Sequence, residues 1–364
     1  MLDGLKIVDL SRVLAGPITT MMLGDLGADV IKVERPGSGD ETRRWGPPFD
    51  DRGESAYYLS VNRNKLSLAA DLEDPSDRAL VTGLIRGADV VIDNFRPGAL
   101  ERRGLDPNAL VAGQPRLVWC TISGFGPDSD RPGYDFVAQA ECGWMAITGD
   151  PAGDPMKVGV ALADVVAGKD AAIAVLAALV GRSSTGRGRR LHVSLAASAV
   201  AALVNVAQNA LVTGRDAQRW GNAHPNLVPY DLFPTLDRPL VVAVGSDSQW
   251  RGLVGALGLE ELAADASLAT NAGRLAQRAR VTAELSRRLS SRPAAAWQRV
   301  LDDAAVPNGI VKSVLEALRE VECSAVTGVA PSTGGSIRRP PPRLDEHGPA
   351  IRRHGWDAFR TVSP

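Results

Sequence analysis

The chain has 364 residues, of which 45% are hydrophobic and 23% charged, and its formal net charge at pH 7 is −1. A single compact core stops growing near roughly 250 to 300 residues, so this length predicts about two domains. The near-zero charge argues against a nucleic-acid or membrane-surface role, and the expected partners are small molecules and other protein chains.

The three cysteines, Cys120, Cys142 and Cys323, have no CxxC spacing. This pattern indicates neither a disulfide framework nor a zinc site, so we expect no metal and a reducing, cytoplasmic compartment. The amino-terminal residues lack a basic region followed by an apolar stretch, and no apolar run reaches the ~18 residues of a membrane helix. The sequence therefore predicts a protein that is neither exported nor membrane-spanning.

The first half of the chain alternates between strand and helix patterns. A strand at residues 6–10, a helix at 17–26 and a strand at 29–34 form a βαβ unit, which predicts parallel strands and a right-handed crossover. The alternation continues with a helix at 77–87, a strand at 89–93, a helix at 107–112 and a strand at 117–122. We expect an α/β fold with a doubly wound, Rossmann-like parallel sheet.

The second half has a different pattern. Two runs rich in Ala, Val and Leu, at residues 161–180 and 196–213, are typical of buried helices, and residues 190–195 between them predict a strand. A second, smaller α/β unit is expected from residue 225 to about 311. From residue 332 the proline-rich tail predicts an extended segment that lies on another surface.

Arginines follow the predicted strands of the first half. Arg12 follows the first strand, Arg35 follows the second, and Arg96, Arg102 and Arg103 follow the third. Open α/β sheets bind ligands at the carboxyl ends of their strands, and guanidinium groups match phosphate geometry. GxGxxG and GxxxxGK[ST] motifs are absent, so a dinucleotide or a triphosphate is not favoured, whereas an adenine nucleotide held by arginines stays open. Several arginines at one edge of the sheet predict a polyphosphate ligand. Each arginine alone could equally be a solvated loop charge.

Asp164 is the one acidic residue in the apolar run from residue 158 to 168. A carboxylate framed by small aliphatic residues is expected in a partly desolvated site, where it is either a structural acid or a reactive group. A structural alternative is that Asp164 caps a helix that starts at Val165, since Asp favours the N-cap position. The residues alone leave these interpretations open.

The segment at residues 94–100, NFRPGAL, resembles the NFRPG motif of the class III CoA-transferases, the family of formyl-CoA transferase and carnitine CoA-transferase. Further landmarks of that family occur in order along nearly the whole chain, at residues 14–17, 23–34, 133–135, 139–140, 143, 148–149, 164 and 185–188. The resemblance implies a large Rossmann-like domain at residues 1–213, a linker and small domain at 214–318, and a segment at 319–364 that returns to the large domain. It also implies an interlocked homodimer.

In that family, the carboxylate at the position of Asp164 attacks the thioester of an acyl-CoA, and an aspartyl-CoA thioester forms on the enzyme. The resemblance thus implies that Asp164 is the catalytic nucleophile, that coenzyme A enters as an acyl-CoA co-substrate, and that the acceptor is a carboxylic acid. An apolar site would protect these intermediates from water. The CoA contacts implied in the same way are Leu14, Ala15, Arg35, Ala70, Asp71, Leu72, Glu73, Asn94, Phe95, Arg96, Arg102, Arg131, Gly133 and Tyr134.

Within the family, the chain is most similar to succinyl-CoA:dicarboxylate transferases of the glutarate type, because residues 218–230 carry RWG, an Ala-His pair and VPY in the same order. This similarity implies succinyl-CoA as donor and a C4 to C5 dicarboxylate as acceptor, with Arg219 or His224 at its distal carboxylate. The same segment could equally be a packed linker turn. Leu14 replaces a glutamine of formyl-CoA transferase and that enzyme's tetraglycine loop is absent, which argues against a formyl and oxalate substrate pair.

Tyr134 stands where the α-methylacyl-CoA racemases of this family have a histidine base. An unperturbed tyrosine, with a pKa of about 10, is a poor base at neutral pH, so transfer is favoured over racemisation. Tyr134 could line the substrate pocket, donate a hydrogen bond to a carbonyl, or pack in the core. Two alternatives stay open, an acyl-CoA racemase or epimerase of the same fold and a non-catalytic CoA-binding protein.

Overall fold

The computed structural model describes residues 1–362, and the chain divides into two compact units. Unit 1 comprises residues 1–144, 157–215 and those from Val321 onward, whereas unit 2 comprises Met145–Met156 and Asp216–Glu320. The sequence-based division placed residues 145–156 in the large domain, whereas the structure groups them with unit 2. Ser363 and Pro364, the end of the predicted returning segment, lie outside the described residues.

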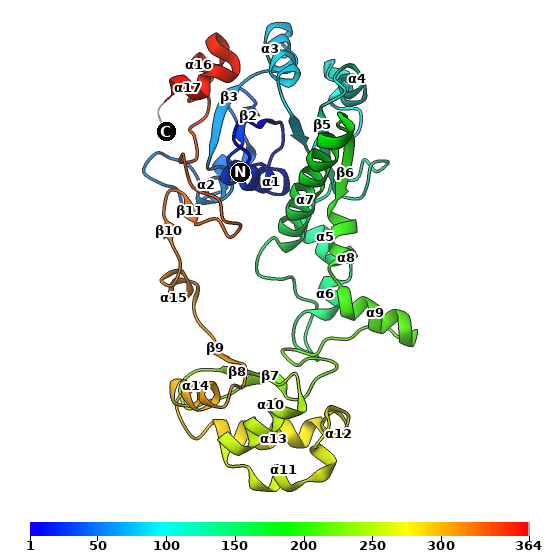
Figure 1. Ribbon diagram of the computed structural model, residues 1–364, viewed down its shortest axis with the longest axis vertical. Coiled ribbons are helices and arrows are strands. Elements are labelled where there is room, and N and C mark those ends of the chain that lie inside the picture. Colours follow the sequence, from blue (N-terminus) through cyan, green and yellow to red (C-terminus); the bar gives the residue numbers. More distant parts are fainter. Residues whose placement is uncertain (363–364) are drawn as a thin grey trace. The chain divides into compact units, whose positions relative to one another are not determined.

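Unit 1 contains a parallel sheet and the helices around it (Figure 1). Its elements up to the first boundary are β1 (Lys6–Asp9), α1 (Ala15–Asp25), β2 (Asp29–Glu34), η1 (Glu41–Arg44), α2 (Ala56–Leu59), β3 (Lys65–Ala69), α3 (Pro75–Arg86), β4 (Val90–Asp93), η2 (Glu101–Arg103), α4 (Pro107–Gly113), β5 (Val118–Ser123), α5 (Asp135–Glu141) and α6 (Trp144–Ile147), which spans the boundary. The later elements are α7 (Leu162–Thr185), β6 (Arg190–Ser194), α8 (Leu195–Ala201), α9 (Val204–Thr213), β10 (Cys323–Ser324), β11 (Gly328–Val329), α16 (Gly348–His354), η4 (Gly355–Asp357) and α17 (Ala358–Thr361).

The main sheet has six parallel strands in the order β3-β2-β1-β4-β5-β6. The expected α/β class with a Rossmann-like parallel sheet is therefore confirmed. In this order the direction of strand progression reverses between β1 and β4, and sheets of this kind bind ligands in the crevice at that point. The loops that follow β1 and β4 thus become neighbours, although they are far apart in the sequence.

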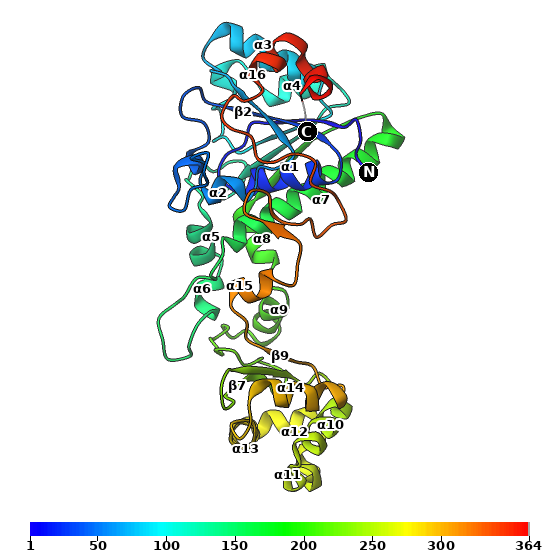
Figure 2. The same ribbon diagram turned by 90° about the vertical axis from the view of Figure 1, so that its left-hand side faces the viewer.

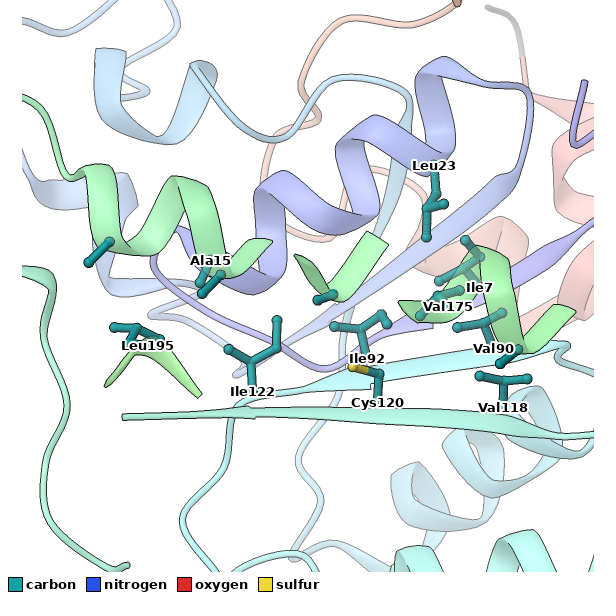
Figure 3. Close-up of a cluster of buried hydrophobic side chains, with 14 of the residues drawn as sticks. Ile7, Ala15, Leu23, Val90, Ile92, Val118, Cys120, Ile122, Val175 and Leu195 are labelled. Atoms are coloured by element: carbon teal, nitrogen blue, oxygen red, sulfur yellow. The ribbon is translucent and has the colours of Figure 1, made fainter. Parts of the chain in front are cut away.

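Helices cover both faces of the sheet. On one face, α1 and α7 pack against Ile7, Val90, Ile92 and Cys120, as the close-up in Figure 3 shows. On the other face, α3, α16 and α17 share a second core, and Figure 2 shows α16 beside α3. The carboxyl-terminal segment therefore completes the core of unit 1.

Several elements differ from the sequence-based predictions. Helix α1 begins at Ala15 and not at residue 17, because a proline is tolerated anywhere in the first turn, where backbone N–H groups have no helical partner. The helix predicted at 196–213 is two helices, α8 and α9, bent by 71°. The tail is not only extended, since α16 and α17 form there and bury Ile351 and Ala358. Strand β3 was not predicted.

Unit 2 is smaller and combines an antiparallel sheet with helices. Its strands β7 (Tyr230–Phe233), β8 (Leu240–Ala243) and β9 (Asn308–Ile310) pair in the order β7-β8-β9. Its helices are α10 (Asp247–Leu257), α11 (Glu260–Ala264), η3 (Ala266–Leu268), α12 (Asn271–Ala276), α13 (Arg278–Leu289), α14 (Ala294–Asp303) and α15 (Val314–Leu318). The core between sheet and helices contains Phe233, Trp250 and Trp297.

Within residues 1–362, none of the helices by itself has the length and apolar composition needed to cross a membrane, and only the bent pair α8 and α9 satisfies both criteria together.

Candidate active site

Two neighbouring cavities open at the carboxyl ends of the strands in unit 1. The larger, which we name the arginine cavity, has a volume of about 510 Å³ and is lined by Arg12, Arg35, Arg44, Arg96, Arg102 and Arg103 together with residues 70–73. The smaller, named the aspartate cavity, has a volume of about 190 Å³ and is lined by Asp164, Leu14, Ala15, Asn94, Arg131 and Tyr134, among others. Arg12, Glu41, Phe95 and Arg96 line both cavities, so the two are contiguous.

Every unit 1 residue that the sequence associated with CoA lines one of these cavities. The arginine cavity contains Arg35, Ala70, Asp71, Leu72, Glu73, Phe95, Arg96 and Arg102. The aspartate cavity contains Leu14, Ala15, Asn94, Phe95, Arg96, Arg131, Gly133 and Tyr134, as well as Asp164. The structure thus brings together side chains that are up to 150 residues apart in the chain, from Leu14 to Asp164.

The arginine cavity has a surplus of positive charge. Arg12 pairs with Glu41 at 3.1 Å and Arg103 pairs with Glu73 at 3.2 Å. Within the described chain, no acidic side chain forms an ion pair with Arg35, Arg44, Arg96 or Arg102. Such uncompensated guanidinium groups around one cavity favour a ligand that carries several phosphates.

Asp164 is the third residue of α7 and is only 8% exposed. The N-cap of α7 is Ala161, so the interpretation of Asp164 as the cap of a helix starting at Val165 is wrong. Burial, and secondarily the nearby Asp135 carboxylate, raise the pKa of Asp164 to about 7. A carboxyl group with this pKa exchanges its proton near neutral pH, which is typical of a reactive acid in a water-poor site.

Asp135, the first residue of α5, provides the missing cap of α7. Its Oδ1 accepts hydrogen bonds from the backbone N–H groups of Ala163 at 2.8 Å and Asp164 at 3.3 Å. Its Oδ2 accepts a hydrogen bond from Gln139 Nε2 at 2.7 Å, and Gln139 Oε1 in turn accepts one from Val158 N. The backbone of the nucleophile candidate is therefore held by a carboxylate from another helix.

Close packing of α1 against α7 places Ala15 beside the first turns of α7. A Cβ atom at Gly168 would lie 2.7 Å from the carbonyl oxygen of Ala15, so only glycine permits this approach. Thr19 Oγ1 donates hydrogen bonds to the carbonyl oxygens of Ala15 and Gly168, at 2.7 and 2.9 Å. The amino-terminal ends of both helices thus meet at the aspartate cavity.

Tyr57 is a neighbour of Asp164 that the sequence interpretation missed. Burial, followed by the charges of Asp164, Asp135 and Asp40, raises the pKa of Tyr57 to about 12, so its hydroxyl stays protonated at neutral pH. The ring of Trp45 packs against it edge-on, with the ring centroids 5.1 Å apart. The available signal was two aromatic residues on either side of a segment rich in proline and glycine, with Tyr57 in α2, and this pattern by itself indicates no chemistry.

The structure defines the surroundings of three of the predicted CoA contacts, Asn94, Tyr134 and Arg131. Asn94 Oδ1 accepts a hydrogen bond from Arg12 N at 3.0 Å, and its Nδ2 donates one to Arg12 O at 2.7 Å, so Asn94 fastens the β1 loop to the β4 loop. Tyr134 is 52% exposed, so the interpretation that it packs in the core is wrong. Arg131 Nη2 lies 2.6 Å from Glu141 Oε1 at the surface.

Two of the three predicted substrate contacts, Arg219 and His224, lie in unit 2 and have partners there. Arg219 donates hydrogen bonds to the carbonyl oxygens of Asp150 and Gly153, at 3.0 and 2.6 Å. His224 Nδ1 accepts a hydrogen bond from Asn226 N at 3.0 Å. Burial and the Arg278 charge lower the pKa of His224, so the ring is neutral at pH 7 and carries its proton on Nε2.

Comparison with known proteins decides the family. The model of CoA-transferase family III matches residues 2–353.

The chain belongs to CoA-transferase family III.

Among curated members, the chain is 39% identical to the succinate–glutarate CoA-transferase of Agrobacterium fabrum, over 100% of this chain and 98% of that protein. It is 41% identical to the succinyl-CoA:glutarate CoA-transferase of Mus musculus, over 96% of this chain and 80% of that protein. Among solved structures, a CaiB/BaiF family protein from Brucella suis is 40% identical with a TM-score of 0.85, and the match covers 97% of this chain and 98% of that one.

Members of this family use CoA thioesters as co-substrates, and the described part of this chain contains no group of three or more His, Cys, Asp or Glu side chains that could hold a metal ion.

For this family III protein, Asp135→Asn is expected to move the acidic limb of the pH–rate profile to lower pH. Removing the Asp135 charge removes one cause of the raised pKa of Asp164, while burial, the larger cause, persists. We expect kcat/KM to reach half its maximum about half to one pH unit lower, as for the loss of one like charge nearby. An unchanged limb in a pH titration of kcat/KM would contradict this assignment. Glu141→Gln, at the exposed end of α5, is the control and should leave the limb in place.

Proposed function

We propose that this protein transfers CoA from succinyl-CoA to a C4 to C5 dicarboxylate through a covalent intermediate on Asp164. The observation that carries the proposal is the position of a buried carboxylate, with a pKa near neutrality, in a cavity contiguous with the arginine cavity. Three relatives that match over nearly the whole chain are named for succinate or succinyl-CoA and glutarate, and a fourth for succinyl-CoA and D-citramalate, which supports these substrates. Another, from Acetobacter aceti, is named for acetyl-CoA and oxalate.

The proposed reaction has four steps and needs no external acid or base. The Asp164 carboxylate attacks the thioester carbonyl carbon, the C–S bond breaks, and CoA thiolate leaves a mixed anhydride behind. The thiolate then attacks the Asp164 carbonyl carbon, which releases succinate and forms aspartyl-CoA. The acceptor carboxylate attacks this thioester, and the released thiolate finally attacks the acceptor carbonyl, which yields acceptor-CoA and free Asp164. The apolar surroundings of Asp164 protect both intermediates from hydrolysis.

The proposed CoA position follows the two cavities. The nucleotide phosphates would lie among Arg35, Arg96 and Arg102, and the pantetheine arm would pass Leu14 and Ala15 to reach Asp164. This placement gives each end of the cofactor the chemistry it requires, cations for phosphate and apolar walls for the arm.

Replacing Arg35 or Arg102 with alanine is expected to raise the KM for succinyl-CoA about tenfold or more with a smaller change in kcat. Each substitution removes a charge-assisted phosphate contact of about 1.5 to 3 kcal/mol that is made equally in the ground and transition states. Steady-state kinetics measure the two parameters. The matched control is Arg287→Ala, an exposed arginine of α13, and an equal effect of that control would contradict the placement.

For the acceptor, we propose that Arg219 or His224 contacts the distal carboxylate of the dicarboxylate. Arg219 already binds two backbone carbonyls through Nε and Nη2, so it would offer Nη1, whereas neutral His224 would offer Nε2–H. Arg219→Lys and His224→Gln should therefore raise the KM for glutarate and leave the KM for succinyl-CoA nearly unchanged.

We also propose that the protein forms the interlocked homodimer implied by its family. Helix α9 has no buried residue although most of its side chains are apolar, and Val204, Leu211 and Val212 are largely exposed. An apolar helix without a partner is costly in water, which supports its burial against a second copy. Light scattering after gel filtration should give twice the chain mass, and Leu211→Glu with Val212→Glu should shift the protein towards monomer.

One experiment tests the transferase mechanism against the alternatives. The protein is incubated with succinyl-CoA and then treated with hydroxylamine, and mass spectrometry locates the modified residue. A hydroxamate at Asp164, together with acceptor-CoA formation from glutarate, supports transfer. Deuterium exchange at the α-carbon of a chiral acyl-CoA without an acceptor would favour a racemase. CoA binding with Asp164 unmodified by a panel of donors, including acetyl-CoA, would leave a non-catalytic CoA-binding protein.

A further inference from the structure

The short loop of residues 11–14, between β1 and α1, has a strained backbone. Val13 has a φ angle of 71°, in the left-handed region. For a β-branched residue this conformation is unfavourable, because the side chain crowds its own backbone. Such strain persists only where surrounding interactions impose it, and it clusters at active sites. Val13 and Leu14 line the aspartate cavity together with Asp164.

A fully buried ion pair imposes this conformation. Lys32 Nζ lies 3.0 Å from Asp40 Oδ2, and neither side chain has exposed surface. Asp40 Oδ2 accepts a hydrogen bond from Val13 N at 3.2 Å, and Lys32 Nζ donates one to Ser11 O at 2.8 Å. Thr42 donates two more hydrogen bonds to Asp40, from its backbone N and its hydroxyl. The pair thus holds the loop on both sides of Arg12.

Further backbone groups of the loop are also bound by side chains. Ser11 N donates a hydrogen bond to Asp9 Oδ1 at 2.9 Å, and Arg12 exchanges two hydrogen bonds with Asn94. The N–H groups of Ser11, Arg12 and Val13 therefore all have a side-chain acceptor. These three hydrogen bonds hold the loop in a conformation that its own sequence does not favour.

We propose that Lys32 and Asp40 are positioning residues, which hold Val13 in its strained conformation so that Leu14 and Ala15 line the cavity beside Asp164. A buried ion pair adds little net stability compared with apolar packing, so specifying a conformation is the role that fits its cost. The inference rests on the proposed transferase function, because the loop can position a thioester only if one is bound there.

The test uses the variants Asp40→Asn, Val13→Gly and their combination. Asp40→Asn weakens the hydrogen bonds that hold the loop, so Val13 can leave its strained left-handed conformation. We therefore expect kcat to fall about tenfold or more, while the KM for succinyl-CoA changes less. Glycine adopts a positive φ without steric cost, so Val13→Gly should restore kcat of the Asp40→Asn protein about fivefold or more. Hydrogen exchange should show faster exchange of residues 11–16 in Asp40→Asn and slower exchange again in the double variant.

Two controls separate positioning from general stability. Asp25→Asn breaks another buried ion pair of unit 1, with Arg63 at 2.7 Å, and should lower the melting temperature without changing kcat. Ala305→Gly relieves a left-handed residue of unit 2, with φ of 53°, and should not restore the Asp40→Asn protein. If Asp40→Asn does not fold, Thr42→Val removes one donor to the same carboxylate and should lower kcat in the same direction.

Two results would overturn the proposal: a kcat and exchange pattern of Asp40→Asn like that of Asp25→Asn, or the absence of any restoration by Val13→Gly. Failure of the proposed function is distinguishable, because the wild-type protein would then transfer CoA from no donor, while the exchange measurements would still report on the loop.

Discussion

Replacing Asp164 with asparagine is expected to lower CoA transfer at least about a thousandfold, because the amide cannot attack a thioester and no covalent intermediate forms. The fold should be retained, since asparagine has nearly the same shape and Asp164 forms no ion pair among the described residues. Steady-state transfer from succinyl-CoA to glutarate measures the loss, and hydroxylamine trapping followed by mass spectrometry should no longer modify residue 164.

Asp170→Asn is the matched control, because Asp170 is a second carboxylate on α7 that bonds to Ser198 and lines neither cavity. It should retain transfer within a few-fold, as expected for a change away from the reacting atoms. Substantial transfer by Asp164→Asn would mean that another residue or a direct displacement carries the reaction.

The same substitution is expected to make the protein more stable at alkaline pH. In the folded protein the pKa of Asp164 is raised from 3.8 to about 7, mainly by burial. Because the folded state holds the proton more tightly, this group's contribution to stability is fully present below pH 4 and is lost as pH rises through 7. A pKa difference of this size corresponds to about 4 kcal/mol, at about 1.4 kcal/mol for each pKa unit.

The predicted quantity is the free energy of unfolding of Asp164→Asn minus that of the wild type. This difference should be about 4 kcal/mol larger at pH 8 than at pH 4. Urea denaturation across this pH range measures the difference between the two proteins. A constant difference for Asp164→Asn would show that the carboxylate is not destabilised in the folded protein, and would remove the physical reason for its reactivity near neutral pH.

Local patterns predicted the elements better than their ends. The βαβ alternation of the first half was right because a strand and an amphipathic helix each show their period in neighbouring residues. Strand β3 was missed although its residues alternate between polar and apolar. Its Lys65 is buried and paired with Asp9, which the sequence alone does not indicate. The break between α8 and α9 was missed because no proline or glycine marks it.

The cavities were predictable in composition but not in arrangement. The arginines after the strands and the NFRPG segment stand in the sequence, and these arginines line the two cavities together with Asn94, Phe95 and Pro97. Tyr57 was not predictable, since its closeness to Asp164 depends on the packing of the loop after η1. The membership of residues 145–156 in unit 2 was not predictable either, because the neighbouring residues on both sides belong to unit 1.

By itself, the sequence determined the α/β class, the family and an acidic residue in an apolar run, because short-range periodicity and motifs carry that information. Only the tertiary structure decided the chemical state of that acid. The strand order brings the β1 loop beside the β4 loop, so that Asn94 binds Arg12 across 82 positions, and α5 brings Asp135 to the start of α7. Burial and the approach of one carboxylate to another raise the pKa of Asp164, and both depend on distances in space that no run of neighbouring residues encodes.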